Sequence, residues 1–179
     1  MTRKELEHVI RAAAQIADDQ ELIVLGSQAV LGAFPDAPPA LLVSNEADLY
    51  PKNKPELADL IDGTIGELSP FHETFGYYAH GVAETTATLP AGWKDRLVPL
   101  SNENTLGATG WCLEVHDLLI SKLVAGRDKD LTYAREAATH GMGDATILKE
   151  RLTRTELSPK LRAVVEGRVE GLFRQESRP

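Results

Sequence analysis

The sequence predicts an α+β protein in which a mixed sheet with flanking helices is followed by a C-terminal helical bundle. Two observations support this fold class. Strand-like apolar or threonine-rich runs alternate with helical patterns as far as residue 114, and every periodic segment beyond that point is helical. We therefore expect an α/β core over residues 1–114 and a helical C-terminal subdomain over residues 115–179.

The core is expected to begin with a helix over residues 2–18. Thr2 and Glu5 have the spacing of a capping box, and apolar side chains recur at helical intervals after them. The fully apolar run at residues 22–25 then predicts a short strand that ends at Gly26. A helix can begin directly on the turn that follows this glycine.

The remaining elements follow from the same patterns. Pro55 suits the first turn of a helix over residues 55–65. Further strands are expected over residues 41–50 (interrupted near Asn45), 77–89, 97–100 and 111–113. The C-terminal helices are expected over residues 115–125, 128–140, 144–152 and 158–173.

Length and composition indicate one globular domain, or a core domain with a helical extension. The chain has 179 residues, and no run approaches the roughly 20 apolar residues that cross a bilayer. The first residues also lack the apolar stretch of a signal peptide. The single cysteine, Cys112, excludes an internal disulfide and is expected to pack in the core, so we expect a cytoplasmic protein.

The net charge of −8 argues against non-specific DNA binding by the whole chain, but the charge is uneven. Eight basic and five acidic residues lie between Lys149 and Pro179, so this segment carries +3 and the rest of the chain −11. Such a segment can hold a polyanion near an acidic core. It can equally form a solvated helix face with ion pairs four residues apart.

Glu46 and Asp48 are the first candidates for a functional site. Residues two apart on a strand point to the same face, which brings their carboxylates close enough to share a hard cation such as Mg²⁺. The alternative is that Glu46 belongs to a turn and Asp48 faces solvent. Glu84, on the expected strand over residues 77–89, can supply a third carboxylate or can itself face solvent. The histidines show no metal-ligand spacing and are interpreted as structural: His72, His80, His116 and His140.

The Gly26-Ser27 turn is the second candidate. A glycine turn that opens onto a helix can present N–H groups, and here a hydroxyl, to a phosphate. The alternative is an ordinary strand-to-helix turn in which glycine supplies a positive φ.

The third candidate is the segment from Lys122 to Asp130. A helix ends at Gly126, and polar residues then open the next helix. Lys122 stands among apolar neighbours and either extends to the surface or contacts a phosphate. Arg127 and Asp130 either join it at a polar rim or cap the helix.

These three features occur in an order that resembles the minimal nucleotidyltransferase superfamily. The order is a strand ending in Gly26-Ser27, an acidic pair on the next strand, and the helical segment from Lys122 to Leu131. The greatest similarity is to small bacterial toxin nucleotidyltransferases of the AbiEii-like and MenT-type groups. The resemblance covers residues 20–140 approximately. Two departures from the family pattern are Glu46 in place of an aspartate and the absence of an arginine just before the pair.

The resemblance implies a mixed sheet with a helical C-terminal part, an NTP bound with Mg²⁺ (or Mn²⁺), and transfer of a nucleotidyl group with release of pyrophosphate. It also implies a tRNA or other RNA acceptor and a cognate antitoxin protein as partners. The implied metal ligands are Glu46 and Asp48. The implied nucleotide-binding residues are Gly26, Ser27, Lys122 and Arg127. The implied catalytic residues are Asp48, Lys122 and Asp130.

From the sequence we therefore expect a metal-dependent nucleotidyltransferase that modifies RNA, as the toxin of a toxin–antitoxin pair. One alternative is the same chemistry on a small cationic molecule such as an aminoglycoside, which the acidic surface suits. Another is a non-catalytic module of the same fold that binds a nucleotide or a protein partner, for which Glu46 is the main support.

Overall fold

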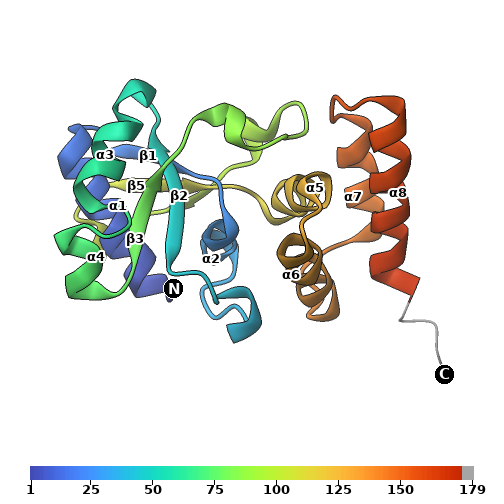
Figure 1. The fold of residues 1–179 in the computed structure, drawn as a ribbon, viewed down its shortest axis with the longest axis horizontal. Coiled ribbons are helices and arrows are strands. Elements are labelled where there is room, and N and C mark those ends of the chain that lie inside the picture. Colours follow the sequence, from blue (N-terminus) through green and yellow to red (C-terminus); the bar gives the residue numbers. More distant parts are fainter. Residues whose placement is uncertain (175–179) are drawn as a thin grey trace. The chain divides into compact units, whose positions relative to one another are not determined.

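The computed structural model describes residues 1–174 of the chain (Figure 1). The chain divides into two compact units. The first consists of Met1–Thr86 and Arg96–Glu114, and the second of Ala87–Asp95 and the chain from Val115 onward. Each unit contains its own buried apolar side chains.

The first unit is built around a five-stranded sheet with the strand order β3-β2-β1-β5-β4. Its strands are β1 (Glu21–Val24), β2 (Glu46–Pro51), β3 (Tyr78–Gly81), β4 (Val98–Leu100) and β5 (Thr109–Cys112). The sheet is mixed, since β2 runs antiparallel to β1 and parallel to β3, whereas β1 and β5 are parallel. This sheet and the eight α-helices of the described residues confirm the predicted α+β class.

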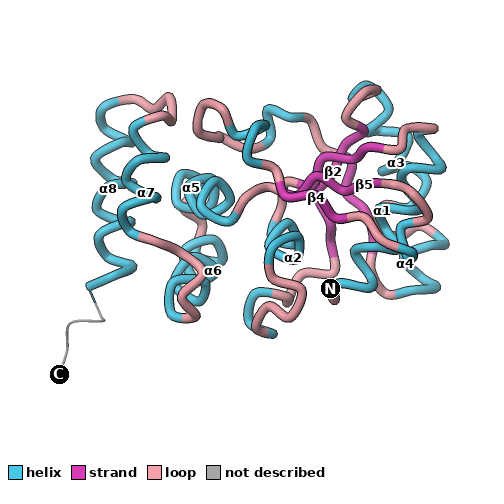
Figure 2. Tube along the Cα trace, turned by 180° about the vertical axis from the view of Figure 1, so that it is seen from behind, coloured by secondary structure: helices cyan, strands magenta, loops and turns pink. Residues whose placement is uncertain are grey.

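Four α-helices flank the sheet: α1 (Arg3–Ala17), α2 (Val30–Ala33), α3 (Ala58–Ile65) and α4 (Pro70–Phe75). Figures 1 and 2 show α1, α3 and α4 on one face and α2 on the other. The predicted capping box is present at the start of α1. The Thr2 hydroxyl accepts a hydrogen bond from the Glu5 N–H, and the Glu5 carboxylate accepts one from the Thr2 N–H at 2.6 Å.

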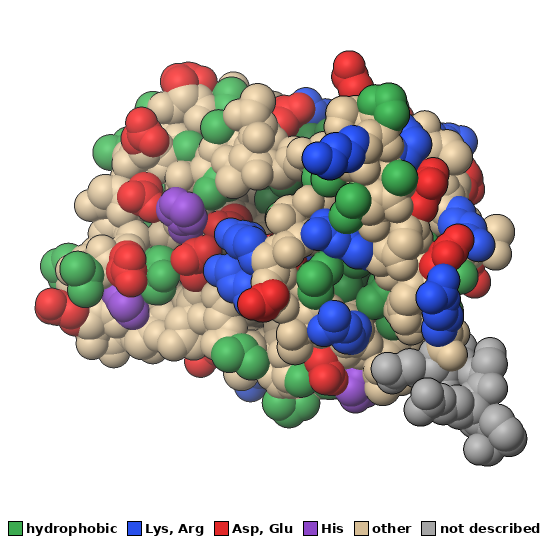
Figure 3. Space-filling view, turned by 45° about the vertical axis from the view of Figure 1, so that its right-hand side comes forward, with side chains coloured by type: hydrophobic (Ala, Val, Ile, Leu, Met, Phe, Trp, Pro, Cys, Tyr) green, Lys and Arg blue, Asp and Glu red, His purple; other side chains and the backbone are tan. Residues whose placement is uncertain are grey.

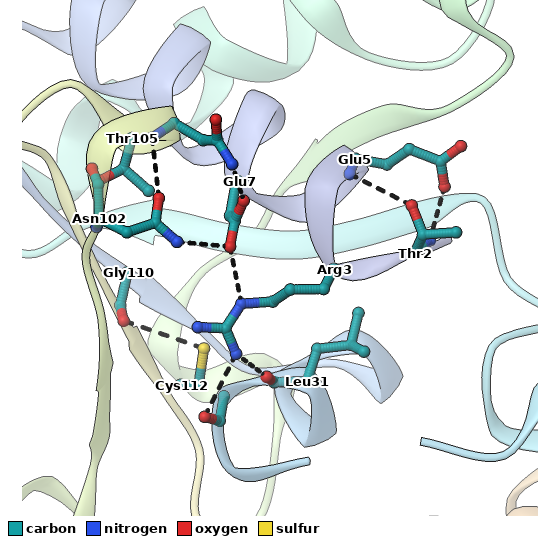
Figure 4. Close-up of polar contacts among 11 residues, drawn as sticks. Thr2, Arg3, Glu5, Glu7, Leu31, Asn102, Thr105, Gly110 and Cys112 are labelled. Atoms are coloured by element: carbon teal, nitrogen blue, oxygen red, sulfur yellow. Dashed lines mark hydrogen bonds and ion pairs between the residues drawn. The ribbon is translucent and has the colours of Figure 1, made fainter. Parts of the chain in front are cut away.

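A buried carboxylate ties α1 to the loop before β5 (Figure 4). Glu7 accepts hydrogen bonds from Asn102 at 2.7 Å, Asn104 at 2.8 Å and Arg3 at 3.0 Å. Arg3 in turn donates to the carbonyl of Leu31, at the other end of the network. Burial alone would raise the pKa of Glu7, but the three donors hold this pKa below its ordinary value, so the network stabilises the ionised form.

The second unit contains the four predicted C-terminal helices: α5 (Val115–Ala125), α6 (Asp128–Thr139), α7 (Ala145–Thr153) and α8 (Pro159–Phe173). α5 ends before Gly126, whose φ of 65° is the left-handed conformation expected of a glycine just after a helix. The hydroxyl of Ser158 caps α8 by accepting from the N–H of Leu161, and Pro159 occupies the first turn as predicted.

Two expected strands are shorter than their patterns indicated. The strand expected over residues 41–50 begins only at Glu46. A 3₁₀ turn occupies Pro39–Leu41. The carbonyls of Leu42 and Ser44 accept hydrogen bonds from the N-terminal amine, and Ser44 also accepts one from the Gln28 side chain. The extended segment expected over residues 77–89 is a strand only at Tyr78–Gly81 and turns at Glu84–Thr86.

Helix α4 was not expected from the sequence. Ser69 caps it by accepting from the N–H of His72, Pro70 opens it, and Gly76 ends it at a φ of 78°. All three signals are present in the sequence, but the helix is only six residues long and has no periodic pattern that would predict it.

Candidate functional site

Glu46 and Asp48 lie on one face of β2, and a histidine of β3 lies beside them. The parallel register of β2 and β3 places Asp48 opposite His80. His80 Nδ1 lies 3.0 Å from Asp48 Oδ1 and 3.8 Å from Glu46 Oε1. One ligand atom from each of the three residues lies within 4.8 Å of the others, a spacing that can hold a metal ion. We call Glu46, Asp48 and His80 the acidic–histidine cluster.

Solvent reaches all three side chains of the cluster. Their exposed fractions are 37% for Glu46, 24% for Asp48 and 48% for His80. A neighbouring hydroxyl fixes one of the carboxylates, since Tyr78 donates to Glu46 Oε2 at 3.1 Å. Burial and the charge of Glu46 raise the pKa of Tyr78 to about 12, so this phenol stays protonated and acts as a donor.

Burial and the neighbouring Glu46 carboxylate disfavour the ionised form of Asp48. Burial raises the pKa of Asp48 above its ordinary value, and the adjacent Glu46 raises it further. His80 opposes this effect but does not cancel it. A cation bound between the carboxylates would remove the repulsion, so the cluster is electrostatically suited to one.

Gly26 is placed directly against Asp48. A Cβ atom added to Gly26 would overlap with the Asp48 carboxylate. Its φ of −66° is accessible to any residue, so glycine is present for this close approach rather than for a positive φ. The alternative explanation, that glycine is needed here for a positive φ, is therefore wrong.

One hydrogen bond joins Leu25, just before the turn, to β2, and another joins Gln28, just after it, to the segment that precedes β2. The N–H of Leu25 donates to the carbonyl of Asp48 at 2.9 Å, and the Gln28 side chain donates to the carbonyl of Ser44 at the same distance. Ser27 lies between them and opens a short 3₁₀ turn, Ser27–Ala29. The first unit thus holds the Gly26-Ser27 turn next to the acidic pair.

Lys122, Arg127 and Asp130 form an ion-pair group within the second unit. Lys122 Nζ lies 3.3 Å from Asp130 Oδ1, and Arg127 Nε lies 2.6 Å from Asp130 Oδ2. Asp130 is 1% exposed. Burial alone would raise its pKa, but the hydrogen bond from Arg127 and the charge of Lys122 hold the pKa below its ordinary value. Asp130 is therefore ionised and holds both basic side chains.

Glu84 does not belong to the acidic–histidine cluster among the described residues. It lies in the turn after β3, and its carboxylate accepts a hydrogen bond from the Tyr50 hydroxyl at 3.3 Å. The cluster gains His80 instead, a residue that we had interpreted as structural. Only the pairing of β2 with β3 reveals it, because 32 positions separate His80 from Asp48 in the chain.

Most arginines of the C-terminal basic segment are engaged within the second unit. Arg154 pairs with Glu150 and Arg174 with Glu170, each four residues apart. Three others have buried partners: Arg151 with Asp117, Arg162 with the carbonyls of Leu152 and Thr155, and Arg168 with the carbonyl of Leu123. Figure 3 shows the resulting surface, where basic and acidic side chains are interspersed. Arg178 and Glu176 lie outside the described residues.

A mixed sheet with a glycine-serine turn beside an acidic strand pair, followed by helices, is a nucleotidyltransferase-like fold. Residues 4–164 match the family described as "Nucleotidyltransferase of unknown function (DUF6036)", and the chain belongs to that family. No curated protein and no solved structure gives a significant match. Within residues 1–174, no helix combines the length and apolar character needed to cross a membrane.

Proposed function

We propose that the protein is a divalent-metal-dependent enzyme that transfers a nucleotidyl group from an NTP to an acceptor. Membership of a nucleotidyltransferase family supports the reaction class. The observation that carries the metal dependence is the acidic–histidine cluster, in which Asp48 lies against Gly26. The turn to which we assign phosphate binding thus lies against a proposed metal ligand within one unit.

The residues of the cluster fit a divalent cation. Two carboxylates offer the oxygen ligands that Mg²⁺ and Mn²⁺ accept, and solvent reaches them. Burial and the charge of Glu46 raise the pKa of Asp48, and a cation would relieve the repulsion between the two carboxylates. In this proposal Glu46 and Asp48 hold the metal, which when bound neutralises charge on the phosphates and on the leaving pyrophosphate.

The remaining roles are assigned to this chain's own side chains. Ser27 and the backbone of Gly26 bind the phosphates of the nucleotide. The family resemblance assigns Lys122 and Arg127 to phosphate contacts. Asp130 fixes both side chains through its ion pairs. Asp130 is thus a positioning residue in this scheme, because its two oxygens are already engaged.

The proposed step is a displacement at the α-phosphorus of the NTP. The acceptor hydroxyl oxygen forms a bond to this phosphorus, the bond to the bridging oxygen breaks, and pyrophosphate leaves with the electron pair. The proton of the acceptor hydroxyl passes to a carboxylate. Glu84 is the proposed base, since it lies on the surface after β3 whereas Asp130 is enclosed.

For the acceptor we propose RNA, at the tRNA acceptor end, with the protein acting as the toxin of a toxin–antitoxin pair. This assignment rests on the resemblance to AbiEii-like and MenT-type enzymes and on the basic C-terminal segment. A small cationic acceptor is the second candidate. The internal pairing of the arginines in α7 and α8 favours it, because these side chains already have partners within the unit.

The test is to incubate the protein with each labelled NTP, Mg²⁺ or Mn²⁺, and either total tRNA or a panel of aminoglycosides. Label is expected in one acceptor class, and Asp48→Asn is expected to abolish the transfer. Asp59→Asn, which changes an exposed aspartate of α3, is the matched control and should retain activity. Equal transfer by Asp48→Asn and the wild type would overturn the proposal.

A further inference from the structure

The acidic–histidine cluster contains an imidazole beside its two carboxylates. The pairing of β2 with β3 brings this imidazole to the carboxylates, since Asp48 and His80 are opposite residues on adjacent parallel strands. Both side chains therefore leave the sheet on the same face. The position of His80 is therefore set by the register of the sheet and not by the conformation of a loop.

His80 faces both carboxylates through the same ring atom. Nδ1 lies 3.0 Å from Asp48 Oδ1 and 3.8 Å from Glu46 Oε1. The ring is about half exposed, so it can adjust its position without disturbing packed neighbours. The imidazole nitrogen faces two carboxylate oxygens. It can therefore act as a third ligand atom for a cation bound between them.

We propose that His80 is the third ligand of the metal held by Glu46 and Asp48, and that the protein consequently selects Mn²⁺-type transition-metal ions over Mg²⁺. This inference rests on the proposed function, because it concerns the metal of the same site. It goes beyond that function by naming a third ligand and by ranking the two metals that the proposed function allows.

The chemistry of the donors gives the preference. Mg²⁺ requires oxygen ligands and near-ideal octahedral geometry, and it exchanges them reluctantly for nitrogen. Imidazole suits the first-row transition ions, and Mn²⁺ accepts both imidazole and carboxylate. A set of two carboxylates and one imidazole is therefore better matched to Mn²⁺ than to Mg²⁺.

The test measures metal binding directly. Mn²⁺ is titrated into the full-length protein, and the free ion is followed by electron paramagnetic resonance, with Mg²⁺ as competitor. We expect Mn²⁺ to bind more tightly than Mg²⁺. Electron spin-echo modulation should show a directly coordinated ¹⁴N nucleus in the Mn²⁺ complex.

Two substitutions at His80 separate ligation from positioning. His80→Asn retains an N–H donor for Asp48 but replaces the imidazole nitrogen by an amide, so the ¹⁴N signal should vanish and Mn²⁺ affinity should fall. His80→Asp creates a three-carboxylate site and should shift the preference toward Mg²⁺. His140→Asn, at an exposed histidine of the second unit, is the matched control and should change neither property.

The outcomes distinguish this inference from the proposed function. Tight Mn²⁺ binding without a ¹⁴N signal, unchanged in His80→Asn, would overturn the role of His80 and leave a site at Glu46 and Asp48. Loss of Mn²⁺ binding in His80→Asn with a shifted preference in His80→Asp would support it. Failure of the wild type to bind either metal would overturn both.

Discussion

The carboxylate of Asp48 occupies the space in which any residue other than glycine at position 26 would place its Cβ atom. The two residues belong to adjacent segments that are also joined by the hydrogen bond from the Leu25 N–H to the Asp48 carbonyl. The sheet therefore allows the acidic side chain and the turn to approach only because Gly26 has no side chain. This contact couples the proposed metal ligand to the proposed phosphate-binding turn.

Gly26→Ala is expected to displace the Asp48 carboxylate and to lower activity far more than stability. An overlap of this kind typically costs about 1–3 kcal/mol in folding free energy, which a folded protein tolerates. Misplacement of a reacting group by about 1 Å can cost about 100-fold in rate. Nucleotidyl transfer and Mn²⁺ affinity should both fall, as measured by label transfer and metal titration.

Gly63→Ala is the control for this substitution. Gly63 lies within α3, and a Cβ atom there meets no other atom within 4 Å. Alanine should therefore raise the free energy of unfolding by about 1 kcal/mol and leave activity unchanged. Equal loss of activity in the two variants would contradict the importance of the contact between Gly26 and Asp48.

Glu7→Gln should weaken the first unit and flatten the acid limb of its stability curve. The pKa of folded Glu7 lies below its ordinary value of 4.5, so its contribution is complete above that pH. The contribution is lost as the pH falls through the lower, folded pKa. Loss of the charged acceptor should cost about 1–3 kcal/mol near neutral pH.

The measurement is urea unfolding of the wild type and Glu7→Gln between pH 3 and pH 7. The difference between the two proteins should be largest near neutral pH and should shrink toward acid pH. Glu73→Gln, which changes an exposed residue of α4, should follow the wild type at every pH. A difference that grows on acidification would contradict the sign of the Glu7 shift.

The sequence predicted most elements because their signals are local. The capping box at Thr2 and the proline at position 159 depend on neighbours within one turn, and both are present in the structure. The start of β2 could not be predicted in this way, because the carbonyls before Glu46 bond the distant N-terminal amine and the Gln28 side chain. Local strand propensity contains no information about such a distant hydrogen-bond partner.

The candidate site likewise combines features with local signals and features that depend on long-range contacts. The common face of Glu46 and Asp48 follows from strand period alone. The addition of His80 depends on which strand pairs with β2 and in what register, and the reason for Gly26 depends on where Asp48 lies. The turn at Glu84 ended the strand that was expected to carry a third carboxylate.

Cys112 should be inert in the folded protein. It is fully buried on β5, and burial raises the pKa of its thiol to about 12, so almost no thiolate exists at pH 8. A thiol reagent such as Ellman's reagent should react only at the rate of unfolding, whereas protein in guanidinium chloride should react at once. Rapid reaction of the native protein would contradict the packing around β5.

Asp130→Asn should release the two basic residues that are proposed to contact the nucleotide. The substitution keeps the size of the side chain but removes the charge that pairs with Lys122 and Arg127. Lys122 is only 12% exposed, so its ammonium group would be left partly buried without a counter-charge. Breaking a buried ion pair in this way costs about 3 kcal/mol or somewhat more.

The variant should also bind NTP more weakly, because Lys122 and Arg127 lose their fixed positions. Thermal unfolding and NTP titration measure the two effects separately. Asp128→Asn, at the exposed first residue of α6, is the matched control. It should leave NTP affinity unchanged and cost at most about 1 kcal/mol, because it removes a negative charge from the first turn of the helix. Reduced stability with unaltered NTP affinity would limit Asp130 to a structural role in the second unit. Parallel losses in Asp130→Asn and Lys122→Ala would instead place both residues in nucleotide binding, since removal of either partner then disables the same contact.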